Sequence, residues 1–259
     1  MSIALPVAQL VIFCLLFIPN KYCLFWHGVP GFLAWFHVGA FLLIRIIGCG
    51  LQIGEDGNPG DKGVLIVNNI GLSPMLLAAF GILHEARIAR ASTVLGSKIE
   101  WVFIFLYYLT VGVGTGLIAS GISNLAGDNP DESDRTIVKV GFAIMLACWF
   151  TLTSLALTSL RPRYPSADAA AGYADGTKLL YAVLISIPLI CLRGIYGVVA
   201  VLDPSWGFST SLAAEVCLSV VPSLLTAVIF VVTGVLTWRI NIKSKYGRSG
   251  LHCRRNVVV

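Results

Sequence analysis

Long apolar runs alternate with short polar segments along the whole chain. Each run is long enough for a helix that crosses the roughly 30 Å hydrocarbon region of a bilayer, which takes about 20 residues. The seven runs cover residues 3–19, 29–52, 64–83, 101–125, 137–160, 179–202 and 209–238. The pattern predicts an all-α fold, a polytopic membrane bundle of seven transmembrane helices.

The polar segments between the runs have the composition of turns. The three longest are rich in Gly, Pro, Asp and Ser, a mixture that favours turns over helices, and they cover residues 54–63, 127–135 and 161–177. No Lys or Arg precedes the apolar core of the first run, so we expect a retained helix and not a signal peptide. Residues 1–238 are expected to form one transmembrane domain, followed by a basic cytosolic tail over residues 239–259.

The composition excludes an ordinary soluble domain. Hydrophobic residues make up 57% and charged residues 12% of the 259 residues, whereas soluble domains carry about 25% charged residues. The mean hydropathy is +0.85. The expected partner is therefore the lipid bilayer. Its membrane is expected to be either the endoplasmic reticulum or the plasma membrane.

The distribution of basic residues predicts the orientation. When the polar segments are assigned alternately to two sides, about thirteen Lys and Arg residues fall on one side and three on the other. Cytosolic loops carry an excess of Lys and Arg. The N-terminus is therefore expected outside and the C-terminus in the cytosol. The net charge of +5 follows from this topology, so we expect no nucleic-acid partner.

Three ionisable residues lie inside the apolar runs, away from their ends: Arg45, Arg193 and Glu215. With a rise of about 1.5 Å per residue, each lies about 9 to 13 Å from the outer end of its helix. Asn68 and Asn69 reach a similar depth. A charged side chain at the centre of a membrane helix costs roughly 2.5 to 3.5 kcal/mol, so these groups are expected to be paired or functional.

Polar residues form stripes on two of the predicted helices. At 100° per residue, one face of the second helix carries His37, Phe41, Arg45, Gly48 and Gln52. One face of the last helix carries Ser211, Glu215, Ser219, Pro222, Ser223, Thr226 and Thr233. Such stripes must face the bundle or a water-filled cavity. Pro222 is also expected to kink the last helix.

Two interpretations of this polar layer stay open. In the first, Glu215 pairs with Arg193 or Arg45 and fixes the helix register, with the Asn and Ser groups as hydrogen-bond partners between helices. In the second, two Arg and one Glu form a net positive site that accepts an anionic or electron-rich ligand.

Other motifs predict structure and not chemistry. Gly112, Gly116 and Ser120 form a line of small residues that is typical of close helix packing. The acidic residues of 131–134 are expected to be solvated. The segment HEARIAR at 84–90 lacks the second His of a zinc-protease helix. The cysteines have no metal-ligand spacing, and no nucleotide or nucleophile-elbow motif occurs. We expect no metal and no cofactor.

Short segments carry a resemblance to a known group of proteins. They are RIIG at 45–48, LQ at 51–52, GLSPMLLA at 71–78 and RGIY at 193–196. With them the chain resembles an uncharacterised group of fungal seven-pass membrane proteins, which is similar in layout to the lipid-translocating-exporter-like proteins. In size, topology and one buried acid it also resembles the integral membrane terpene cyclases of meroterpenoid clusters, which implies a place in fungal secondary metabolism.

Two functions follow from these observations. In an enzyme such as a terpene cyclase or isomerase, Glu215 would act as a general acid on a lipophilic isoprenoid intermediate, and the ring of Tyr196 would stabilise positive charge. In a translocator or seven-helix sensor, the Arg pair would hold the head of a lipid or small molecule. The residues expected to bind the lipophilic small molecule in either case are Arg45, Gln52, Asn68, Asn69, Arg193 and Tyr196. A structural component without a ligand is the third possibility.

Overall fold

The computed structural model describes residues 4–54, 70–90, 97–125, 131–161, 170–202 and 212–238. The helices are α1 (Ala4–Trp26), α2 (Gly28–Gly54), α4 (Leu72–Ala89), α5 (Ser97–Leu125), α6 (Glu132–Thr158), α7 (Ala170–Leu202), α8 (Leu212–Glu215), the π-helix η3 (Val216–Val220) and α9 (Val221–Leu236). Among the described residues, seven helices are long and apolar enough to span a membrane, with α8, η3 and α9 forming the last span. The predicted all-α bundle is confirmed at this level. Residues 239–259, the predicted basic tail, lie outside the described residues.

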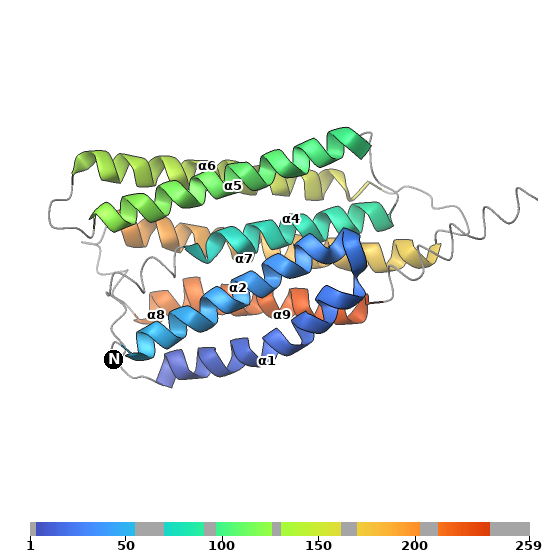
Figure 1. Ribbon diagram of the computed structural model, residues 1–259, viewed down its shortest axis with the longest axis horizontal. Coiled ribbons are helices and arrows are strands. Elements are labelled where there is room, and N and C mark those ends of the chain that lie inside the picture. The colour runs from blue at the N-terminus through green and yellow to red at the C-terminus, as the bar shows by residue number, and fades with distance from the viewer. Residues whose placement is uncertain are drawn as a thin grey trace, which may run out of the picture.

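The long helices lie side by side and successive helices run in opposite directions (Figure 1). We name the two ends of the bundle the Ala4 side, where α1 begins, and the Trp26 side, where α1 ends. The central helix is α4, which packs between α2 and α7. Of its span 72% is buried, whereas the most buried of the other spans reaches 50%. The peripheral helices α1, α5 and α6 expose many large apolar side chains, among them Leu15, Phe25, Phe105 and Phe150, as expected for surfaces that face lipid.

Close packing between α2 and α4 depends on the absence of a side chain at Gly81. A Cβ at this position would come within 2.7 Å of the Cα of Ala34. Between α5 and α6 the glycines that approach the neighbouring helix are Gly114, Gly121 and Gly141. The predicted packing line through Gly112 and Gly116 is wrong, because a Cβ on either would meet nothing within 4 Å. Small-residue spacing shows that a helix can pack closely, but not on which face.

The turn between α1 and α2 is tight. It passes through His27 and Gly28, and Gly28 has a φ of 67°, a left-handed conformation that glycine adopts without a Cβ clash. The His27 N–H donates to the Cys23 carbonyl at 3.1 Å. This turn fixes the His27 side chain against the interior of the bundle.

Four predicted boundaries within the described residues differ from the structure by five residues or more. α1 continues past residue 19 to Trp26, with Pro19 inside the helix. α4 continues past residue 83 through Glu85 to Ala89. α7 begins at Ala170, inside a segment predicted to form a turn. α6 begins at Glu132, again inside a predicted turn. There the Asp134 carboxylate accepts from the Asp131 N–H at 3.3 Å and from the Asn124 amide at 2.9 Å, so acidic residues start the helix and tie it to α5.

Candidate functional site

The predicted polar layer begins with Arg45 on α2. Its side chain is 4% exposed, and Nη2 donates to the hydroxyl of Ser223 on α9 at 3.0 Å. The guanidinium carbon also lies 5.8 Å from the ring centre of Phe13 on α1, within the range of a cation–π contact. Arg45 therefore joins three helices in the half of the bundle nearer the Ala4 side.

Arg193, Tyr196 and Glu215 gather around Arg45. Arg193 on α7 is 3% exposed, whereas Tyr196 and Glu215 are partly exposed. Glu215 at the end of α8 attracts both Arg45 and Arg193, and the two Arg residues repel each other. Tyr196 interacts with all three. The structure thus brings together four of the residues predicted from sequence, contributed by three separate membrane spans.

The part of the last span's polar stripe that the structure describes also faces inward, and Ser211 lies outside the described residues. Ser219, Ser223 and Thr226 are buried, and the Thr226 hydroxyl donates to the Pro222 carbonyl at 2.8 Å. Between Glu215 and Pro222 the chain forms the π-helix η3. A π-helical turn inside an α-helix is rare and frequently lies at a functional site. Here it follows the candidate acid directly.

The remaining predicted site residues divide into two groups. Gln52 is buried on the same stripe of α2 as Arg45, two turns nearer the Ala4 side. Asn68 and Asn69 lie outside the described residues. We therefore define the polar layer as Arg45, Arg193, Tyr196 and Glu215, with Ser223 as its hydrogen-bond partner on α9.

A second buried polar cluster lies at the Trp26 side and was missed by the sequence analysis. His27 Nδ1 is 2.6 Å from Glu85 Oε1, and Trp35 Nε1 donates to Glu85 Oε2 at 3.2 Å. His27 Nε2 donates to the Gly234 carbonyl at 2.9 Å. His27 is 0% exposed and Glu85 is 3% exposed. The cluster ties the α1–α2 turn to α2, α4 and α9.

The hydrogen bond to Gly234 fixes the protonation pattern of His27. A carbonyl only accepts, so Nε2 carries a proton, and one further proton lies between Nδ1 and the Glu85 carboxylate. Burial alone would lower the pKa of His27, but the hydrogen bond and charge of Glu85, with the Gly234 carbonyl, outweigh burial and raise this pKa above its ordinary value. Below this raised pKa, His27 and Glu85 form an imidazolium–carboxylate pair.

One residue in the sequence, Gly31, is consistent with this buried cluster. The predicted apolar run ends at residue 83, before the polar residues His84 and Glu85, so the prediction places Glu85 in a polar segment. Yet Gly31 sits where a Cβ would come within 2.9 Å of both Glu85 carboxylate oxygens and 2.7 Å of the His27 Cβ. Gly31, one helical turn after His27, leaves the space that the buried His27 and Glu85 side chains occupy.

The described residues contain no group of three or more His, Cys, Asp or Glu side chains that could hold a metal ion. The chemistry available to the polar layer is that of two guanidinium groups, a phenol, a carboxyl group and a hydroxyl. These groups can bind an anionic or hydrogen-bonding head, and the carboxyl group can transfer a proton.

Comparison with known proteins gives a family without an activity. Residues 3–240 match DUF7702, a domain of unknown function. No curated protein and no solved structure matches the chain. The resemblances to lipid-translocating-exporter-like proteins and to membrane terpene cyclases stay predictions. Since the match covers the seven apolar spans and both polar clusters, the chain belongs to the DUF7702 family.

Proposed function

We propose that this membrane protein binds the anionic head of an amphipathic, lipid-soluble molecule at the polar layer. The observation that carries the proposal is the convergence of two buried guanidinium groups, from α2 and α7, on one partly exposed carboxyl group. Arg matches carboxylate and phosphate groups through paired N–H donors. A site with two such groups and one carboxyl suits a ligand that brings a further negative charge.

A purely structural ion pair explains less of this geometry. One Arg and one Glu would suffice to fix the register of two helices, and each further buried charge adds an insertion cost of about 2.5 to 3.5 kcal/mol. Arg45 and Arg193 repel each other. Both guanidinium groups lie beside a carboxyl group that is partly exposed, and the surrounding helices are apolar. This arrangement favours the binding of an anionic head group on a lipid-soluble molecule.

A second candidate function is enzymatic, and it rests on Glu215. The carboxyl group is partly exposed, while Arg45 and Arg193 are almost fully buried. It also stands directly before the π-helix η3. In this hypothesis Glu215 protonates a lipophilic isoprenoid intermediate in fungal secondary metabolism, Tyr196 stabilises the developing cation, and the Arg pair orients the polar end of the substrate.

We extend the proposal to the orientation and the membrane. The excess of Lys and Arg on one side supports an N-terminus outside and a C-terminus in the cytosol. The polar layer, in the Ala4-side half, would then open toward the outer leaflet. Either the endoplasmic reticulum or the plasma membrane fits this arrangement.

The binding proposal is tested by what the protein retains on purification. Wild type, Arg193→Gln and the control Arg135→Gln would be purified from the native host in neutral detergent, and bound lipophiles extracted and identified by mass spectrometry. Arg135 is exposed at the start of α6, so its variant has the same charge change outside the layer. We expect an anionic amphiphile with wild type and Arg135→Gln that is depleted with Arg193→Gln. Equal recovery from all three would reject the proposal.

The enzymatic candidate has its own test. The gene is deleted in the native host, and strains expressing wild type or Glu215→Gln are compared by metabolite profiling. Accumulation of the same unprocessed lipophilic intermediate in the deletion and the Glu215→Gln strain supports the general acid. If Glu215→Gln restores the wild-type profile, Glu215 is not the acid. An unchanged profile on deletion, with altered lipid or drug sensitivity, favours the translocator or sensor.

A further inference from the structure

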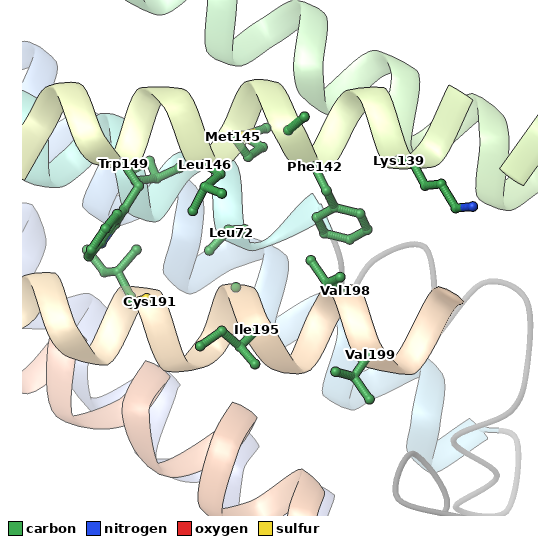
Figure 2. Close-up of a pocket in the computed structure, with 14 residues that line it drawn as sticks. Leu72, Lys139, Phe142, Met145, Leu146, Trp149, Cys191, Ile195, Val198 and Val199 are labelled. Carbon is green, nitrogen blue, oxygen red and sulfur yellow. The ribbon is translucent and has the colours of Figure 1, made fainter. Parts of the chain in front are cut away.

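A groove lined by apolar side chains separates α6 from α7. It encloses about 350 Å³, within the range of about 300 to 1,000 Å³ that small-molecule sites occupy. Phe142, Leu146 and Trp149 of α6 point across it toward α7 (Figure 2). These residues lie on the opposite side of α7 from Arg193 and Tyr196, so the groove is separate from the polar layer.

The floor and the rim of the groove differ in exposure. Met145 and Ile190, with Leu76 from α4 behind them, are at most 4% exposed. Leu146 and Ile195 on the rim are 51% and 52% exposed. An apolar floor and an open apolar rim between two membrane-spanning helices match the hydrocarbon of a bilayer in chemistry.

The two ends of the groove set its length and its chemistry. One end is closed where Trp149 Nε1 donates to the Ile187 carbonyl at 3.0 Å, bridging α6 and α7. At the other end lies Lys139 (Figure 2), which is exposed. At about 1.5 Å per residue, the distance from Lys139 to Trp149 is about 15 Å, which is half of the roughly 30 Å hydrocarbon thickness. One lipid leaflet therefore matches the groove.

We propose that this groove binds one acyl chain of an anionic phospholipid from the Ala4-side leaflet, with Lys139 contacting the lipid head group. The chain enters between Leu146 and Ile195 and ends against Trp149. Lys139 lies one turn before Phe142 on the same face of α6, where a head group joined to the buried chain would reach it. The proposal does not depend on the function of the polar layer.

The test compares phosphatidylglycerol with phosphatidylcholine of identical chains. The full-length protein is reconstituted in phosphatidylcholine nanodiscs with a small share of phosphatidylglycerol, and retained lipids are counted by native mass spectrometry. Wild type is expected to retain one phosphatidylglycerol at the groove, whether or not the polar layer binds another. Ala143→Trp, which fills the groove from its exposed rim, is expected to lose it. The matched control Ala147→Trp makes the same change one turn further along α6, at an exposed position outside the groove, and should behave as wild type.

A charge variant separates the head group from the chain. Lys139→Gln is expected to weaken phosphatidylglycerol binding about fivefold and to leave phosphatidylcholine binding unchanged. Arg161→Gln, exposed at the far end of α6, should change neither. Unaltered retention by Ala143→Trp, equal losses from Ala143→Trp and Ala147→Trp, or no charge preference at Lys139 would overturn the proposal.

A second measurement avoids a bulky substitution. Phosphatidylglycerol with brominated acyl chains quenches nearby tryptophan fluorescence in the same nanodiscs. We expect quenching at low mole fraction, and we expect Trp149→Phe to remove most of this quenching because Trp149 closes the groove. If Trp149→Phe leaves the quenching at low mole fraction unchanged, no chain lies against Trp149 and the proposal is wrong.

Discussion

Replacing Glu85 tests the buried cluster at the Trp26 side. In Glu85→Ala, His27 Nδ1 and Trp35 Nε1 lose the partners that lie at 2.6 and 3.2 Å. Without the carboxylate, burial lowers the pKa of His27 and the ring becomes neutral, so Nδ1 and Trp35 Nε1 stay buried without partners. Each unsatisfied buried group costs about 1 to 3 kcal/mol, and we expect a loss of about 2 to 6 kcal/mol in the free energy of unfolding.

Glu85→Gln should be far milder, for a reason specific to this geometry. The new amide N–H can donate to Nδ1 of a neutral His27, while the amide oxygen accepts from Trp35 Nε1. His27 Nε2 continues to donate to the Gly234 carbonyl. All the hydrogen bonds survive and only the charge assistance is lost, which costs about 1 kcal/mol.

The assay is SDS-induced unfolding in mixed micelles, followed by tryptophan fluorescence. Glu132→Ala is the matched control, since Glu132 is exposed in the first turn of α6 and its loss should cost less than about 1 kcal/mol. If Glu85→Ala costs no more than Glu132→Ala, or if Glu85→Gln is as damaging as Glu85→Ala, Glu85 is not the buried hydrogen-bond partner of His27 and Trp35.

Three further predictions concern packing, pH and topology. Gly234→Ala should destabilise the protein by about 1 to 3 kcal/mol, because its Cβ would collide with the ring of Trp35; Gly112→Ala, with open space around it, should be neutral or slightly stabilising in the same assay. Because the pKa of His27 is raised above 6.5, its stabilising contribution is complete below that pH and is lost as pH rises through the folded-state pKa. The free energy of unfolding of wild type should therefore fall as the pH rises from 6.5 through the folded-state pKa of His27. His27→Gln should show a smaller decrease over the same pH range. Equal decreases in the two proteins would contradict this prediction. A protease added to sealed, right-side-out vesicles should leave an epitope at residues 239–259 intact, and its removal without detergent would reverse the orientation.

The membrane bundle could be predicted from the sequence because the length of each apolar run indicates a membrane-spanning helix. The sequence was also sufficient to bring Arg45, Arg193 and Glu215 into one layer, because helix rise fixes depth and 100° per residue fixes the face. Hydrophobic length, helix rise and helix periodicity are local properties that do not depend on contacts between distant segments.

What the sequence left open depends on contacts between distant segments. Glu85 lay beyond the end of a predicted helix, and only the tertiary packing of His27, Trp35 and Gly234 around it makes it a buried residue. The π-helix before Pro222 was not predicted either. Its effect was expected as a simple kink, because a missing N–H can be accommodated in several ways that the sequence does not distinguish.

The central claim is that the polar layer recognises negative charge on a lipophilic molecule. Its most direct test is the equilibrium binding of octadecyl phosphate and octadecanol to purified protein in neutral micelles. We predict that wild type and Arg135→Gln prefer the phosphate. Arg193→Gln should lose about 1.5 to 3 kcal/mol of that preference, a factor of roughly 10 to 150. Equal binding of the two probes to wild type, or an undiminished preference in Arg193→Gln, would contradict the account.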